Sequence, residues 1–167
     1  SLCGMGVNNY GQLGSGSPCP AGTDAIATGV RSAAAGAWHT LFVKEDGTLW
    51  SVGNNQAGQL GDGTKTLRTM PVQITSNVRT VAAGFWFSLI LKEDRTLLGM
   101  GQNDQGQLGE GVSYALGTST PVEISQGVWR IAAGPSHSLF LAENYRLTTT
   151  AVNGSVQSAP ERSFYSI

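Results

Sequence analysis

The feature that most constrains the fold is a loop that the chain repeats three times. A first motif appears as GVNNYGQLG (6–14), GNNQAGQLG (53–61) and GQNDQGQLG (101–109), at intervals of 47 and 48 residues. A second motif keeps a similar spacing, as AAGAWHTLFV (34–43), AAGFWFSLIL (82–91) and AAGPSHSLFL (132–141). Periods of roughly 50 residues are typical of stacked units, because one such unit cannot cover its own apolar faces without neighbours.

Within one period the pattern is that of short strands joined by turns. One period contains four β-branched or apolar segments, PVQI (71–74), VRTVAA (78–83), FSLILK (87–92) and TLLGMG (96–101). KEDG (44–47) and KEDR (92–95) separate such segments and predict hairpin turns. No window of about eleven residues or more keeps the apolar period of a helix. The sequence therefore predicts an all-β fold of β-propeller blades, each a sheet of four antiparallel strands.

The motif positions divide the chain into three units. These units run approximately over 6–52, 53–100 and 101–153, preceded by a late strand at 1–5 and followed by a tail at 154–167 outside the repeat. A closed propeller usually has at least about four blades, so three units predict a partial ring. We expect the chain to be a fragment of a longer protein. The alternatives are a ring completed by a second copy, which would make a homodimer, or an open arc that associates through its ends.

The order of motifs also resembles a known repeat. GxNxxGQLG, a Pro-Val strand, V-x-x-(V/I)-A-A-G-x-x-H-(S/T)-L and a G-x-L turn strand together resemble the repeat named after the regulator of chromosome condensation. The resemblance extends from about residue 2 to about residue 153. It implies a propeller of about seven blades in full-length members. Members of that family include a guanine-nucleotide exchange factor for a small GTPase that also docks on chromatin, and others that bind and inhibit β-lactamase.

The residues that recur in the two motifs are explained by turn geometry and packing. Glycine permits backbone conformations that other residues avoid, and a short amide side chain can tie the N–H and C=O groups of a turn together. We therefore assign structural turn roles to Gly11, Gly14, Gly58, Gly61, Gly106, Gly109, Asn8, Asn55 and Asn103. His39 and His137 occupy the position that Phe87 takes in the middle copy, so we expect a packed ring of the core at all three positions.

Composition disfavours several classes of function. Ten Lys and Arg face eleven Asp and Glu, and this balance gives no long-range field to attract nucleic acid or a membrane. The chain has no GxSxG motif, no dinucleotide fingerprint and no phosphate-binding loop, and it has only two histidines. We expect no catalysis, no cofactor and no metal. Cys3 and Cys19 form either a disulfide or two free thiols, and the sequence leaves both open.

What differs between the copies points to a binding surface. The glycine of each AAG motif is followed by Ala37-Trp38, Phe85-Trp86 or Pro135-Ser136, at a turn between two strands. Large aromatic side chains are frequent at binding hot spots, so Trp38, Phe85 and Trp86 are candidate partner contacts. Tyr114, in the longest of the loops that precede a Pro-Val strand, is another candidate. The alternative is that these rings pack over neighbouring blades, as we expect for Trp50 and Trp129 in the core.

The sequence therefore predicts a non-catalytic scaffold that binds a protein partner through turns on one propeller face. The alternatives from the resemblance are an exchange factor for a small GTPase and a protein inhibitor of an enzyme. An exchange factor is expected to carry acidic residues and a protruding wedge on one face. This chain has no long insertion, and its acidic loop residues are chiefly Asp62, Asp104 and Glu110.

Overall fold

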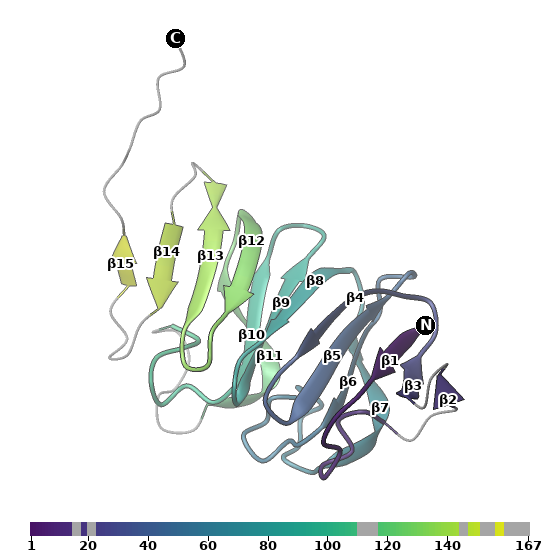
Figure 1. The fold of residues 1–167 in the computed structure, drawn as a ribbon. Helices are drawn as coiled ribbons and strands as arrows, with labels where there is room; N and C mark the ends of the chain where they lie inside the picture. Colours follow the sequence, from purple (N-terminus) through teal and green to yellow (C-terminus); the bar gives the residue numbers. More distant parts are fainter. Residues whose placement is uncertain (15–17, 20–22, 110–116, 144–146, 151–155, 159–167) are drawn as a thin grey trace.

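Four antiparallel sheets follow one another along the chain (Figure 1). The computed structural model describes residues 1–14, 18–19, 23–109, 117–143, 147–150 and 156–158, with side chains at 1–14, 26–109 and 117–143. In those ranges there is no helix with the length and apolarity needed to cross a membrane. The predicted all-β architecture of four-stranded blades is confirmed.

The first sheet has three strands, in the order β1-β3-β2, and the other three have four strands each. The first contains β1 (Leu2–Gly4), β2 (Pro18–Cys19) and β3 (Thr23–Ala27). The second contains β4 (Val30–Ala35), β5 (His39–Lys44), β6 (Leu49–Gly53) and β7 (Arg68–Thr75). The third contains β8 (Val78–Ala83), β9 (Phe87–Lys92), β10 (Leu97–Gly101) and β11 (Thr118–Ser125). The fourth contains β12 (Val128–Ala133), β13 (Ser138–Ala142), β14 (Leu147–Thr150) and β15 (Val156–Ser158).

The grouping of strands into sheets differs from the sequence-based units. The PVQI segment lies in β7 and pairs with β6, with Val72 opposite Ser51, so it completes the second sheet and does not begin the third. Between the two sheets stand only residues 76–77, and the first amide of the next sheet, Val78 N–H, donates to Gly47 O at 3.0 Å. The spacing of the motifs predicts the length of a unit but not the residue at which a sheet begins. A two-residue link such as 76–77 can join two paired strands of a hairpin as well as two separate sheets.

The end of the repeat also differs from expectation. The tail at 154–167 was placed outside the repeat, yet β15 pairs with β14, with Gln157 opposite Thr149. The fourth sheet therefore takes its outer strand from this segment. Cys3 in β1 is disulfide-bonded, and the side chain of Cys19 lies outside the described residues.

The core lies between successive sheets. β5 and β9, the second strands of the second and third sheets, are buried on both faces, which accounts for their continuous apolar runs. One cluster joins the second and third sheets through Leu41, Val43, Leu49, Val78, Val81, Ile90 and Met100. Another joins the third and fourth sheets through Phe87, Leu89, Leu91, Leu97, Leu108, Val128 and Phe140. Stacked faces of this kind are the main source of stability in the fold.

The repeated loop is closed by its amide and plugged by its leucine. Asn55 Oδ1 accepts a bond from Leu60 N–H at 3.0 Å, and Asn103 Oδ1 accepts one from Leu108 N–H at 2.7 Å. Both leucines are fully buried below the loop. The turn glycines all adopt positive φ: Gly11, Gly14, Gly58, Gly61, Gly106 and Gly109.

The same loop fastens each sheet to the next. Ser88 Oγ in the third sheet donates to Gln59 O in the loop of the second at 2.8 Å, and Ser138 Oγ donates to Gln107 O at 2.7 Å. Gly63 N–H donates to Ser119 O of β11 at 2.9 Å. A loop that the sequence presents as a local turn is therefore part of the contact between sheets.

Two glycines of one loop allow its role as a local turn to be tested separately from its role in the contact between sheets. Both Gly58 and Gly63 have positive φ, but an added Cβ at Gly58 would lie 2.7 Å from Ser119 Cα, whereas at Gly63 the nearest atom is 3.9 Å away. We expect Gly63→Ala to cost about 1 kcal/mol of unfolding free energy through backbone strain alone. Gly58→Ala should cost roughly 2 kcal/mol more, because the neighbouring sheet must also move. Equal losses in urea denaturation would contradict the between-sheet role.

The ring position of the second motif is buried in two copies and exposed in the third. His39 is buried with its ring against Gly36, and Phe87 is buried against Gly84 in the same way. His137, expected in the core, is exposed instead. The reason is that His39 and Phe87 are covered by the sheet that follows theirs, whereas no further sheet follows the fourth within the described residues.

His39 is held as a neutral hydrogen-bond donor. Its Nε2 lies 2.8 Å from Ser88 Oγ, and because that hydroxyl donates to Gln59 O, the histidine nitrogen carries the proton. Its Nδ1 is buried without a partner among the described residues. Burial lowers the pKa of His39 from 6.5 to about 4.

This depressed pKa predicts loss of stability in mild acid. Between about pH 6.5 and pH 4 the unfolded chain binds a proton at His39 that the folded chain does not, so protonation favours unfolding as the pH falls. The full effect is about 3 kcal/mol. His39→Phe, which copies the residue at Phe87, should flatten the pH dependence of chemical denaturation in this window. Parallel curves for the variant and the wild type would contradict the buried neutral histidine.

Candidate functional site

The two ends of the sheet stack differ in chemistry. Because the strands are antiparallel, the turns after the AAG strands and the repeated loops lie at the same end of the stack, which we call the aromatic end. Its segments are turns 36–38, 84–86 and 134–137 and loops 5–14, 54–67 and 102–109. Turns 45–48, 76–77, 93–96 and 126–127 lie at the opposite end, which we call the charged end.

Ion pairs at the charged end link neighbouring sheets. Arg31 Nη2 lies 2.5 Å from Glu93 Oε1 and donates to Val78 O at 2.6 Å. Arg95 Nη1 lies 3.0 Å from Glu143 Oε1. These groups are partly exposed, so the pairs contribute modestly to stability and neutralise much of the charge at this end.

Each of the two strand tryptophans lies against a cationic side chain. Lys44 Nζ lies 4.3 Å from the ring centre of Trp50, which is half-buried. The guanidinium of Arg95 lies 3.5 Å from the ring centre of Trp129, whose side chain is 44% exposed. The expectation of core positions was therefore wrong for Trp129. The register shift between Val128 and Arg130 places an extra residue in β12, and its side chain faces outward.

The aromatic end is apolar and poor in charge. Among the residues with described side chains, five of the six exposed large hydrophobic ones belong to its loops and turns or to the adjacent half of β7: Met5, Val7, Leu67, Met70 and Phe85. Among residues with described side chains, the charged ones at this end are Asp62, Lys65, Arg68 and Asp104. Depletion of charge and enrichment in aromatic residues and methionine distinguish the centres of protein interfaces from other surface.

The predicted contact residues form two aromatic pairs at this end. The rings of Phe85 and Trp86 have centres 6.1 Å apart, with Phe85 exposed and Trp86 half-buried. Trp38 is half-buried and packs edge-on against Tyr10, with ring centres 5.3 Å apart. Sequence reasoning did not identify Tyr10, although its position holds Ala57 and Gln105 in the other loops. Tyr114 lies outside the described residues.

Backbone contacts hold the turns in one continuous surface. Trp38 O and Trp86 O accept bonds from Asn54 N–H and Gln102 N–H at 2.8 and 2.9 Å, which join each turn to the loop of its own sheet. Phe85 N–H donates to Pro135 O of the next turn at 3.0 Å. The aromatic side chains therefore project from a fixed backbone, and little order has to be gained when they contact a partner.

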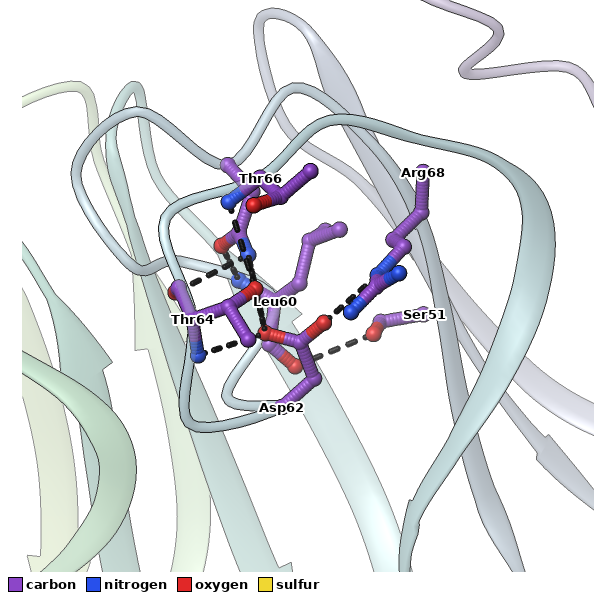
Figure 2. Close-up of polar contacts among 7 residues, drawn as sticks. Ser51, Leu60, Asp62, Thr64, Thr66 and Arg68 are labelled. Atoms are coloured by element: carbon purple, nitrogen blue, oxygen red, sulfur yellow. Dashed lines mark hydrogen bonds and ion pairs between the residues drawn. The ribbon is translucent and has the colours of Figure 1, made fainter.

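Loop 62–68, which follows the second copy of the first motif, is held by a carboxylate that accepts four hydrogen bonds (Figure 2). Asp62 Oδ1 accepts from Thr64 N–H at 2.9 Å, Thr64 Oγ1 at 2.7 Å and Asn55 Nδ2 at 3.0 Å. Its Oδ2 accepts from Arg68 Nε at 2.7 Å, and the Asp62 side chain is only 4% exposed. Burial opposes ionisation of this carboxyl group, but the bonds from Thr64, Arg68 and Asn55 outweigh it and lower its pKa.

The described residues at this end include one serine and histidine pair, and it is buried. The Ser88 and His39 pair has the distance of a nucleophile and a base, but both side chains are fully buried and the serine proton is directed to Gln59 O. Within the part of the chain that is described, His, Cys, Asp and Glu side chains do not gather in groups of three that could hold a metal ion.

Removal of the Asp62 charge should loosen the loop without unfolding the sheets. Asp62→Asn weakens the pair with Arg68 and should cost about 1 to 2 kcal/mol of unfolding free energy. Asp94→Asn is the matched control, since Asp94 also accepts a bond from the amide of a threonine two residues on but is exposed and forms no ion pair with an arginine of the described residues. Amide hydrogen exchange of residues 62–68 should rise in the first variant only. Unchanged exchange there would show that the carboxylate does not fix the loop.

Comparisons with known proteins agree with this architecture. A family model described as "Regulator of chromosome condensation (RCC1) repeat" matches residues 30–59 and 78–107, and a second model of that repeat matches residues 46–91. Human WBSCR16 is similar in structure, with a TM-score of 0.77 and 22% identity over 93% of this chain and 46% of that chain. Prp20p of Saccharomyces cerevisiae, described with its binding properties to Gsp1p and histones, gives a TM-score of 0.77 and 22% identity over 97% of this chain. Yeast RCC1 (Prp20) bound to Kap60 gives 0.73 and 24% over 88%.

At these identities the likeness establishes the fold. The chain spans 46% of the WBSCR16 chain and 47% and 38% of the two Prp20 chains.

Proposed function

Because this chain is a partial β-propeller of RCC1-type repeats, we propose that it is a non-catalytic scaffold whose protein partner docks on the aromatic end. The observation that carries the proposal is the separation of chemistry between the two ends. Exposed apolar side chains gather at the end that holds few charges, while the between-sheet ion pairs stand at the other.

The aromatic pairs are suited to act as the centre of the interface. Phe85 is exposed and rests against Trp86, so a partner can bury both rings in one contact. Aromatic side chains bury a large area with few rotatable bonds, which is why they dominate binding energy at such centres. Trp38 and Tyr10 supply a second aromatic contact on the preceding sheet.

The comparisons support a protein as the class of partner. Prp20p is described with Gsp1p and histones, and yeast RCC1 with Kap60. A small GTPase is the partner that the resemblance of the repeats implies, and accelerated nucleotide release would distinguish exchange from docking alone. The aromatic end of this chain favours docking, because its described acidic residues are already bonded, Asp62 to Arg68 and Asp104 to Gln102.

Capture of partners from an extract of the source cells tests the aromatic end. Wild-type chain, Phe85→Ala and Trp86→Ala would be immobilised, and the bound proteins quantified by mass spectrometry. We expect Phe85→Ala to weaken the specific partner by about tenfold or more, as for a hot-spot residue. Trp129→Ala removes an equally exposed aromatic side chain from the charged end and serves as the control. Equal capture by Phe85→Ala and wild type, with both folded by circular dichroism, would overturn the proposal.

A further inference from the structure

Loop 62–68 is built to keep its shape. The Asp62 carboxylate receives four bonds, and its neighbour Gly63 donates to Ser119 O of the next sheet. Ser51 Oγ donates to Leu60 O just before the loop at 3.0 Å (Figure 2). The loop is therefore attached to the strand before it, to the strand after it and to the neighbouring sheet.

The side chains of three residues at the tip of this loop stand outside that network, although Thr66 N–H donates to Thr64 Oγ1 at 3.2 Å. Lys65, Thr66 and Leu67 are exposed, and Leu67 is among the large apolar side chains at the surface. The Lys65 ammonium group has no ion pair or hydrogen bond within the described part of the chain. A rigid loop thus presents one cation and one apolar side chain to the solvent.

Among the described residues, the acid nearest to Lys65 along the chain is already bonded to other groups. Asp62, three residues away, gives one oxygen to Arg68 and the other to Thr64 and Asn55. Asp104, the other described acid at the aromatic end, accepts from Gln102 Nε2 at 2.7 Å. The charge of Lys65 is therefore available to a group outside the chain, and an exposed cation steers carboxylates toward its side chain.

We propose that Lys65, Thr66 and Leu67 form a second contact of the partner interface and recognise an acidic segment that carries an apolar side chain. In this arrangement a partner carboxylate lies against the Lys65 ammonium, and a partner aliphatic or aromatic group packs on Leu67. The inference rests on the proposed function, because the loop lies at the same end as Phe85 and Trp86. It adds the chemistry of the partner to that function.

A nucleic acid fits this surface less well than an acidic protein segment. A polyanion is held by many cations along its backbone. Here one unpaired cation stands beside Leu67 and a neutral Asp62 and Arg68 pair. The combination of a single cation with apolar side chains matches a peptide in which acidic and apolar residues alternate.

Synthetic peptides test the inference directly. Three sets of short fluorescent peptides would share the same Leu and Phe content and differ in carrying Asp and Glu, Lys and Arg, or Ser and Gln. We expect the wild-type chain to bind the acidic set best by fluorescence anisotropy, with binding weakened by added salt. Lys65→Glu should lower the affinity for the acidic peptides about fivefold, which corresponds to the energy of an exposed ion pair. The affinity of Lys65→Met should lie between those of Lys65→Glu and the wild type.

The controls separate a local effect from a general one. Arg79→Glu makes the same kind of change at an exposed residue of the charged end, and it should leave peptide binding unchanged. Absence of a preference for acidic peptides, or equal effects of Lys65→Glu and Arg79→Glu, would overturn the inference.

The two proposals can fail separately. If Phe85→Ala abolishes capture from the extract and Lys65→Glu changes neither capture nor peptide binding, the aromatic end binds the partner and the loop does not. If Lys65→Glu weakens the acidic peptides and Phe85→Ala leaves capture unchanged, the loop contact stands and the aromatic centre is wrong.

Discussion

The hydrogen bond from a serine of one sheet to a loop carbonyl of the sheet before it is the contact on which the rest of the structure depends. Ser88 and Gln59 make it between the second and third sheets, and Ser138 and Gln107 repeat it between the third and fourth. The bond is buried, so loss of either partner would leave an unsatisfied polar group in the core. It sets the distance at which the apolar faces meet and the position of the loops at the aromatic end.

The sequence predicted the architecture well, because the signal was a period. Three copies of the GQLG loop and the AAG strand predicted a repeating unit of four short strands, and turn chemistry explained Asn55 and Asn103. It did not predict how strands divide into sheets, since the link at 76–77 looks like a hairpin whether or not its strands pair. Trp129 and His137 were misplaced for different reasons. Trp129 occupies a bulge position that holds Arg31 and Arg79 in the other copies, so comparison of the copies could have predicted its exposure. The exposure of His137 depends on the neighbouring sheet, which its local pattern does not show.

The candidate site was predictable only in part. Aromatic residues in a tight turn are visible in the sequence, and Phe85 and Trp86 lie together as their adjacency suggests. The partnership of Trp38 with Tyr10 joins residues of different sheets, and the separation of charge between the two ends appears only once the strands are paired. The sequence of loop 62–68 does not predict its rigidity, because an aspartate near an arginine is common in loops. Its rigidity comes from the convergence of Asn55, Thr64 and Arg68 on one carboxylate.

Within the described residues, the third sheet packs against a four-stranded sheet on each side. In a stack of this kind the stability of a sheet is a sum of its contacts with its neighbours, so a sheet packed on both faces opens less readily than one packed on a single face. Phe85 and Trp86 extend from the third sheet, so the candidate contact surface is anchored where local unfolding should be rare. A partner bound there would be held by a backbone that is stabilised from both sides.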